Sequence, residues 1–158
     1  MQSKKTKYLT QAAIVAAIYV MLTLISKPIA IGFVEIRISE ALCVLPFLLP
    51  SSVWGLFCGC FIANAFNGSI LDMVIGSLAT LIGAYLTSKI KNKWLCPIPA
   101  ILSNTILIPF VIMKYSGVWS PSAYFAASAG VFVSETASVY VLGMILLLAL
   151  EKKNVFKH

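Results

Sequence analysis

The chain has 158 residues, of which 60% are hydrophobic and 11% are charged, and its formal net charge is +7. A soluble domain typically has about 25% charged residues, so a water-soluble core of this size cannot hold so much apolar surface. We therefore expect a single integral membrane domain over residues 1–158. Because the lysines stand at the ends of apolar segments, the positive charge indicates membrane orientation rather than a nucleic-acid partner.

Apolar segments follow one another along the chain and predict an all-α membrane protein. A membrane helix needs about 20 apolar residues, and fewer when it lies inside a bundle. The predicted helices cover about residues 8–26, 38–50, 53–66, 70–88, 97–113 and 122–150. The break at residues 50–52 has an alternative, because residues 41–66 could also form one long kinked helix.

The lysine clusters decide between these alternatives. Three clusters of three lysines hold nine of the 12 basic residues, and the positive-inside rule places all of them on the cytoplasmic side. They are Lys4, Lys5 and Lys7 before the first segment, Lys89, Lys91 and Lys93 after the fourth, and Lys152, Lys153 and Lys157 after the sixth. Only two separate helices within residues 41–66 leave even numbers of spans between the clusters. We therefore expect six transmembrane helices, cytoplasmic termini, and outer loops near residues 27–37, 67–69 and 114–121.

The sequence gives little support to catalytic or metal-binding chemistry. His158 is the only histidine and is terminal, and no nucleotide-binding, zinc or nucleophile-elbow motif is present. The cysteines lie in or beside apolar segments, and we expect them to serve as small apolar residues. They are Cys43, Cys58, Cys60 and Cys96. We predict that the protein is not an enzyme and holds no metal or cofactor.

The first predicted helix carries two rows of alanines at helical spacing. Ala12 and Ala16 form one row, and Ala13 and Ala17 form the other. Small residues allow another helix to approach closely in lipid. The alanine face could pack within the protein's own bundle or against a different subunit, and the sequence leaves both alternatives open.

Polar residues inside membrane helices usually face the bundle interior or a cavity. Asn104 lies near the middle of the fifth helix, and Glu135 lies near the middle of the sixth. Asn104 could form an interhelical hydrogen bond, whereas a mid-membrane carboxylate must be protonated, paired or bound to a ligand. Asn67 ends the third helix, and Asp72 starts the fourth, where a helix N-terminus could also stabilise a carboxylate.

The entrance to the second helix gathers charge that the rest of the chain avoids. Glu35, Arg37 and Glu40 lie within six residues of one another. Arg37 is expected to pair with Glu35 or Glu40 and to hold the first outer loop in shape. Glu40 is the better candidate for a ligand contact, although a helix N-terminus would also stabilise its carboxylate.

Two aromatic residues flank the last outer loop. Trp119 lies in that loop, and Tyr124 lies at the start of the sixth helix. Aromatic residues at this depth are usually interfacial anchors. The alternative is a stacking surface for a planar ligand.

Four runs of the sequence carry a resemblance to a known family. They are VEIRISEALCVLP (34–46), NAFNGSILDMVIGSLATLIGA (64–84), PAILSNTILIPFVI (99–112) and SETASVY (134–140). With six short helices and an alanine-rich first helix, the chain resembles the S components of energy-coupling-factor (ECF) transporters. Within that group it is similar to the QueT family, which is assigned to the uptake of queuosine precursors. The resemblance covers nearly the whole chain.

This resemblance implies a multi-subunit importer in the cell membrane. A membrane coupling subunit and two cytoplasmic ABC-type ATPases would drive import, while the S component would capture a small-molecule ligand from outside. The alanine rows of the first helix would then face the coupling subunit. The S component would topple in the membrane to carry its site inward.

The implied ligand is a 7-deazaguanine base, and some queuosine precursors also carry an aminomethyl cation. A carboxylate accepts the two adjacent N–H donors of a guanine edge in a bidentate manner. We assign Glu135 to these donors, with Asn104 beside it, and Glu40 or Asp72 to the amine. The predicted ligand-binding residues are Arg37, Glu40, Asn67, Asp72, Asn104, Trp119, Tyr124 and Glu135.

Other functions remain open at this stage. The chain could be an S component for a flavin, thiamin or biotin, which would share the same fold. It could instead be a self-sufficient carrier or channel, or an accessory membrane subunit without a ligand. An intramembrane enzyme is the weakest alternative, because no matched nucleophile and base can be named.

Overall fold

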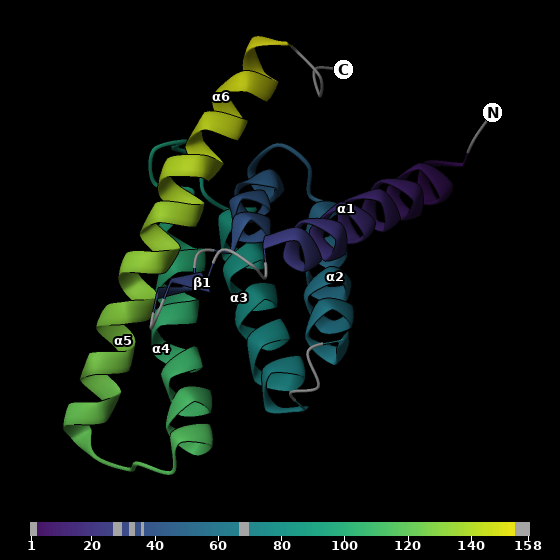
Figure 1. The fold of residues 1–158 in the computed structure, drawn as a ribbon. Helices are drawn as coiled ribbons and strands as arrows, with labels where there is room; N and C mark the ends of the chain where they lie inside the picture. Colours follow the sequence, from purple (N-terminus) through teal and green to yellow (C-terminus); the bar gives the residue numbers. More distant parts are fainter. Residues whose placement is uncertain (1–2, 27–29, 32–33, 36, 67–69, 154–158) are drawn as a thin grey trace.

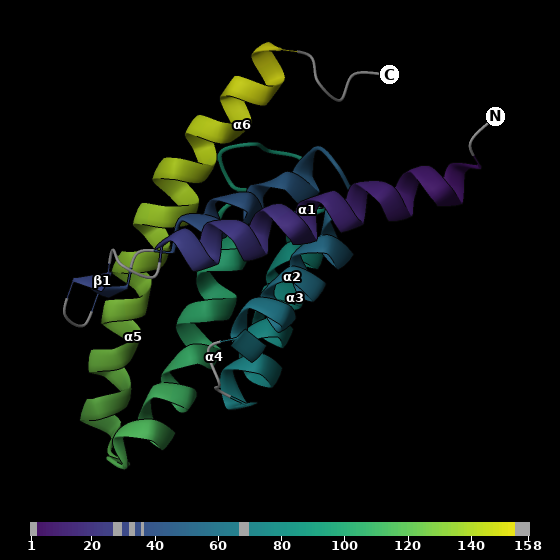
Figure 2. The same ribbon diagram turned by 45° about the vertical axis from the view of Figure 1, so that its right-hand side comes forward.

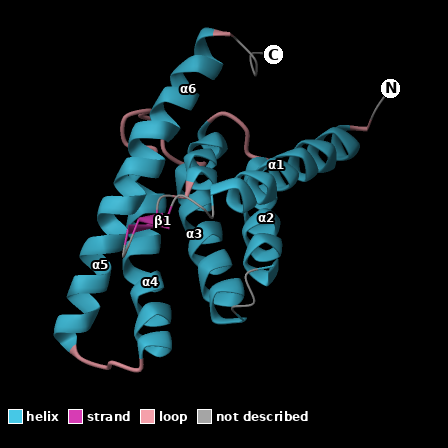
Figure 3. Cartoon of the chain, viewed as in Figure 1, coloured by secondary structure: helices cyan, strands magenta, loops and turns pink. Residues whose placement is uncertain are grey.

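The computed structural model describes residues 3–26, 30–31, 34–35, 37–66 and 70–153. These residues form helices joined by short connections, apart from one small pair of strands (Figure 3). The helical elements are α1 (Lys4–Ser26), η2 (Ile38–Phe47), α2 (Ser52–Phe66), η3 (Asp72–Gly76), α3 (Ser77–Thr87), α4 (Ile98–Ser116), α5 (Pro121–Glu135), η4 (Thr136–Leu142) and α6 (Gly143–Lys152). Of these, η2 is a 3₁₀ helix, and η3 and η4 are π-helical segments.

The described part of the chain holds six helical segments, each close to a range predicted from hydropathy. Three segments are long and apolar enough to cross a membrane, namely Lys4–Ser26, Ile98–Ser116 and the continuous rod Pro121–Lys152. The other three segments, Ile38–Phe47, Ser52–Phe66 and Asp72–Thr87, are apolar but shorter. The chain is therefore a helical membrane protein that combines long and short apolar helices.

The helices pack as a bundle that α1 crosses at a steep angle (Figures 1 and 2). α1 packs on α2, α3 packs on both α2 and α4, and α4 packs on α5. η2 contacts α1, α3, α6 and η4, so it lies at the centre of the bundle. This central position explains why its residues from Ser39 to Pro46 are all buried.

The predicted break within residues 41–66 is confirmed, because η2 ends at Phe47 and α2 begins at Ser52. Pro50 lies in the connection, where the Ser52 hydroxyl donates a hydrogen bond to the carbonyl of Leu49 at 2.6 Å. The 3₁₀ form of η2 was not predicted. At about 2.0 Å per residue, its ten residues reach about 20 Å, which is farther than an α-helix of that length.

The first predicted outer loop contains a β-hairpin that the sequence analysis did not predict. β1 (Ala30–Ile31) pairs antiparallel with β2 (Val34–Glu35), and Ala30 is opposite Glu35. Two-residue strands are too short to show the alternation of apolar and polar residues by which a strand is recognised. Arg37 and η2 follow β2 in the sequence.

The connection between α4 and α5 is shorter than predicted, because α4 continues to Ser116. Gly117 follows with φ of 69°, a left-handed conformation that glycine adopts without strain at a helix end. Ser120 then caps α5 by accepting a hydrogen bond from the Ala123 amide at 3.1 Å, and Pro121 occupies the first helical position. These local signals fix where both helices end.

Two glycines of α2 allow α1 to approach very closely. A Cβ atom added to Gly55 would lie 2.6 Å from the carbonyl oxygen of Ala12, and one added to Gly59 would lie 3.0 Å from that of Ala16. The row of Ala12 and Ala16 therefore packs inside the protein's own bundle. Ala13 and Ala17 are exposed on α1.

The thiols match the expectation of small apolar residues only in part, because Cys43 also donates a hydrogen bond to Glu40. Cys43, Cys60 and Cys96 are buried, Cys58 is exposed, and all four are free. Burial, with a smaller contribution from the negative charge of Glu151, raises the pKa of Cys96 to about 11. Because the thiolate is the reactive form, Cys96 is inert at neutral pH.

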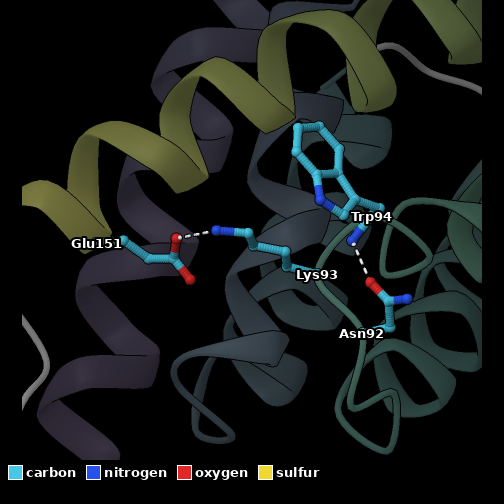
Figure 4. Close-up of polar contacts among 4 residues, drawn as sticks. All are labelled: Asn92, Lys93, Trp94 and Glu151. Atoms are coloured by element: carbon cyan, nitrogen blue, oxygen red, sulfur yellow. Dashed lines mark hydrogen bonds and ion pairs between the residues drawn. The ribbon is translucent and has the colours of Figure 1, made fainter.

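The connection 88–97 meets the C-terminal end of α6 at one end of the molecule. Lys93 Nζ lies 3.2 Å from Glu151 Oε2, and the Asn92 side chain accepts a hydrogen bond from the Trp94 amide at 3.0 Å (Figure 4). The N-terminal end of α1 lies toward the same end in both views (Figures 1 and 2). The described members of the three lysine clusters therefore lie toward this end, at the start of α1, in the connection 88–97 and at the end of α6.

Removing this ion pair with Glu151→Gln should change the free energy of unfolding by less than about 1 kcal/mol, because exposed pairs are weak. The two side chains are 38% and 32% exposed. The midpoint of thermal unfolding in detergent would measure the effect. A large drop in the unfolding midpoint would instead show that the ion pair stabilises the conformation of the connection 88–97.

Candidate functional site

A cavity of about 500 Å³ lies among the helices and gathers most of the chain's acidic residues. Three of the five acidic residues line it, together with one arginine. The polar lining residues are Arg37, Glu40, Asp72, Thr80, Asn104, Tyr115, Ser116, Ser134 and Glu135. This volume falls within the range of about 300–1,000 Å³ that is usual for small-molecule sites.

The cavity brings together five of the predicted ligand-binding residues from separate parts of the chain. They are Arg37 and Glu40 at the start of η2, Asp72 in η3, Asn104 in α4 and Glu135 at the end of α5. Such convergence of polar groups in an apolar chain indicates a site rather than isolated packing contacts.

The remaining predicted residues are not placed in this cavity. Trp119 and Tyr124 line a separate, open apolar hollow beside Phe110 and Met113. The Tyr124 ring packs on Phe110 with the ring centroids 5.0 Å apart, and its hydroxyl donates to the carbonyl of Ile106 at 3.1 Å. Asn67 lies outside the residues that the structure describes.

Glu135 presents a carboxylate oxygen that no described residue pairs. Its side chain is only 8% exposed and is hydrogen-bonded to the amide of Asn104, which is 4% exposed. The Oε2 atom is buried and has no hydrogen-bond partner among the described residues. Burying an unsatisfied polar atom costs free energy. A hydrogen-bond donor from outside the chain would therefore stabilise this oxygen.

The π-helical segment η4 begins at Thr136, directly after Glu135. A π-helical turn widens the helix and shifts the following side chains, and such turns are frequent at functional sites. η3 likewise begins at Asp72 on the other side of the cavity. Two of the three cavity carboxylates therefore lie where a helix departs from α geometry.

Glu40 differs from Glu135 because both of its oxygens have partners within the chain. The Tyr19 hydroxyl donates to Oε1 at 2.5 Å, and the Cys43 thiol donates to Oε2 at 3.2 Å. Side chains three residues apart are eclipsed in a 3₁₀ helix, so η2 places Cys43 directly beside Glu40. Glu40 and Arg37 both lie within electrostatic range of Glu135.

Asn64 supports the side of the cavity on which Asp72 lies. It is 1% exposed, and its Nδ2 donates to the backbone carbonyl of Asp72 at 2.9 Å. A Cβ atom added to Gly76 would lie 3.1 Å from the same nitrogen. Gly76 therefore leaves space for Asn64 to hold the start of η3.

Two tyrosines near the site were not among the predicted residues. Tyr115 lines the cavity from α4, eleven residues or about three helical turns after Asn104. Tyr19 lies in a buried stripe of α1 that also contains Val15 and Thr23. In both cases a spacing of three or four residues along the helix was the signal that could have identified the face.

Comparison with known proteins agrees with the resemblance found in the sequence. The sequence model of the family described as QueT transporter matches residues 9–152. The queuosine precursor transporter QueT of Lactococcus lactis subsp. cremoris (strain MG1363) is 33% identical over 100 residues. That alignment covers 60% of this chain and 59% of the relative's own length, which is less than two thirds of it. No solved structure matches.

The family match spans nearly the whole helical region, including every helix that lines the cavity. It confirms the family that the four sequence runs indicated, and it describes transport rather than catalysis. The chain therefore belongs to the QueT transporter family.

Proposed function

We propose that the chain is the substrate-capture subunit of an ECF-type importer and binds a queuosine precursor, a 7-deazaguanine base. The family match and the name of the Lactococcus relative support this class of ligand. The observation that carries the proposal is the unpaired, buried Oε2 atom of Glu135 in the cavity. A ligand that donates hydrogen bonds would supply the partner that this atom lacks among the described residues.

The guanine edge of the ligand would fill this requirement. A carboxylate accepts two adjacent N–H donors in a bidentate manner, and Glu135 would receive them. Asn104, hydrogen-bonded to Glu135, would keep the carboxylate in place and could also meet a ring nitrogen or carbonyl. Tyr115 supplies the aromatic surface in the cavity, because Trp119 lines another hollow.

The other charged groups of the cavity would bind the rest of the ligand. Glu40 or Asp72 would meet an amine substituent, and Arg37 would balance the carboxylates around them. A site that relies on buried polar partners rejects analogues that lack the matching groups by large factors. The cavity would therefore select ligands that carry the matching polar groups.

Import would require a coupling subunit and two ABC-type ATPases, since the sequence has no nucleotide-binding motif. Ala13 and Ala17 form the part of the predicted docking face that is exposed, whereas Ala12 and Ala16 pack near α2. In the proposed topology the single domain crosses the cell membrane six times. The gathering of lysine-rich regions at one end supports cytoplasmic termini.

Transport assays in proteoliposomes would test this function. We expect the purified chain alone to bind a 7-deazaguanine base in calorimetry but to import none of it. Uptake should appear only when the coupling subunit, the ATPases and ATP are present. Mass spectrometry of small molecules that copurify with the chain would identify the ligand without a prior choice.

Each alternative predicts a different outcome of these assays. Uptake by the chain alone would replace the proposal with a self-sufficient carrier. Binding of a flavin, thiamin or biotin in place of the deazaguanine base would keep the S-component role but change the ligand. Ala17→Leu provides a control on the docking face, because it should reduce uptake while leaving ligand binding unchanged.

A further inference from the structure

The buried hydroxyl of Tyr19 connects α1 with the cavity. Tyr19 is 1% exposed and does not line the cavity, but its hydroxyl donates a hydrogen bond to Glu40 Oε1 at 2.5 Å. Glu40 is itself 3% exposed and lines the cavity from η2. Tyr19 is therefore hydrogen-bonded to a carboxylate that lines the cavity, although it does not line the cavity itself.

The packing of α1 explains how Tyr19 reaches Glu40. A Cβ atom added to Gly59 would lie 2.9 Å from the Cβ of Tyr19, so the glycine allows the tyrosine to pass close beside α2. One turn later, the Thr23 hydroxyl donates to Ser39 Oγ at 2.8 Å, beside Glu40 in the chain. Two neighbouring hydrogen bonds therefore hold the first turn of η2 against α1.

Glu40 keeps acceptor capacity after these contacts are made. A carboxylate offers about four lone-pair sites, and Tyr19 and Cys43 each use one. Apart from the contacts with these described residues, the remaining lone pairs can accept from a group in the cavity. Glu40 is thus a carboxylate held by Tyr19 and Cys43. Glu135, in contrast, has an oxygen without a partner among the described residues, and Asp72 is only partly buried.

The charges around the cavity favour a cation beside Glu40. Three carboxylates and one guanidinium are among the lining residues, so ionised groups would carry an excess of negative charge. In an apolar surrounding such an excess needs a counter-charge. An alkylammonium group has three donors and one positive charge, and it suits a pre-oriented carboxylate.

We propose that Tyr19 is a positioning residue that orients Glu40 toward the amine of the ligand, so that the cavity prefers aminomethyl-bearing precursors to uncharged ones. This inference rests on the proposed function, because it assumes a 7-deazaguanine base in the cavity. It selects Glu40 over Asp72 as the amine contact. It also gives α1 a direct role in ligand selectivity.

Calorimetry with two probes that share one ring system tests the proposal. 7-Aminomethyl-7-deazaguanine carries the cation, and 7-cyano-7-deazaguanine is its uncharged counterpart. The purified parent chain should bind the amine at least about tenfold more tightly, the effect of one well-placed charged hydrogen bond. Tyr19→Phe removes only the hydroxyl and should lower this preference by about tenfold, while binding of the nitrile changes less than about threefold.

Two further variants separate positioning from general packing. Thr23→Val removes the neighbouring bond between α1 and η2 without touching Glu40, and it should leave the preference unchanged. In the Glu40→Gln background, Tyr19→Phe should cause no further loss, since the two residues act through one contact.

The outcomes distinguish this inference from the proposed function. Equal weakening of both probes by Tyr19→Phe would reduce Tyr19 to a structural residue and overturn the inference. A parent chain that binds both probes equally would also overturn it, while the proposed function would stand. A parent chain that binds neither probe would overturn both.

Discussion

Glu135→Gln should weaken binding of a 7-deazaguanine base by about 100-fold, which corresponds to about 3 kcal/mol. Glu135 is buried in the cavity, and its Oε2 atom has no partner among the described residues. Glutamine would place an NH₂ group where the ligand presents its own N–H donors. Two donors then face each other, and the loss of a hydrogen bond to a charged group costs about 1.5–3 kcal/mol.

The same substitution should not destabilise the protein without ligand. A buried carboxylate oxygen without a donor is costly, and a neutral amide reduces that cost. The side chains have nearly the same size, and the amide oxygen of the glutamine can still accept the hydrogen bond from Asn104. The midpoint of thermal unfolding in detergent should therefore stay the same or rise while affinity falls, a separation typical of binding residues.

Glu151→Gln provides the matched control, because it makes the same chemical change at the far end of α6, outside the cavity. Calorimetry should find its affinity for the base unchanged. If Glu135→Gln bound the base as tightly as the parent chain, Glu135 would not be the contact for the guanine edge. The unpaired oxygen would then need another explanation within the protein.

The helical segments were predictable because each one combines an apolar run with a clear stop signal. Pro50 and the serines after it separated η2 from α2, and the even number of spans between lysine clusters gave an independent reason for that break. Hydropathy does not distinguish a 3₁₀ from an α-helix, because both bury a continuous apolar run. The geometry that places Cys43 beside Glu40 was therefore not visible in the sequence.

The cavity was predictable in part, and for one physical reason. Asn104 and Glu135 are costly in the middle of membrane helices, so a polar environment for them could be inferred. Trp119 offered no comparable signal, because an aromatic residue is stable at an interface, in a hollow or in a site. Tyr19 was overlooked for the opposite reason: a tyrosine in an apolar helix looks like packing until its hydroxyl is seen to reach Glu40.

Gly55→Ala should destabilise the chain by about 1–3 kcal/mol, the usual cost of overpacking a tight contact. The new Cβ atom would lie 2.6 Å from the backbone carbonyl oxygen of Ala12 and 2.9 Å from the Cβ of Val15. A backbone carbonyl cannot rotate away as a side chain does, so α1 itself must move. In an unhindered helix, replacing glycine by alanine stabilises the fold by up to about 1 kcal/mol. A loss of stability in Gly55→Ala would therefore report the close contact with α1.

Cys58→Leu supplies the control, because it enlarges an exposed side chain on the same helix and should leave the unfolding midpoint nearly unchanged. Gly55→Ala should also weaken binding of the amine probe, since a displaced α1 carries Tyr19 away from Glu40. An unchanged or higher unfolding midpoint for Gly55→Ala would show that α1 does not pack as closely on α2 as described. The packing of α1 on α2 would then not determine the position of Tyr19. The predicted link between this packing and ligand selectivity would be wrong.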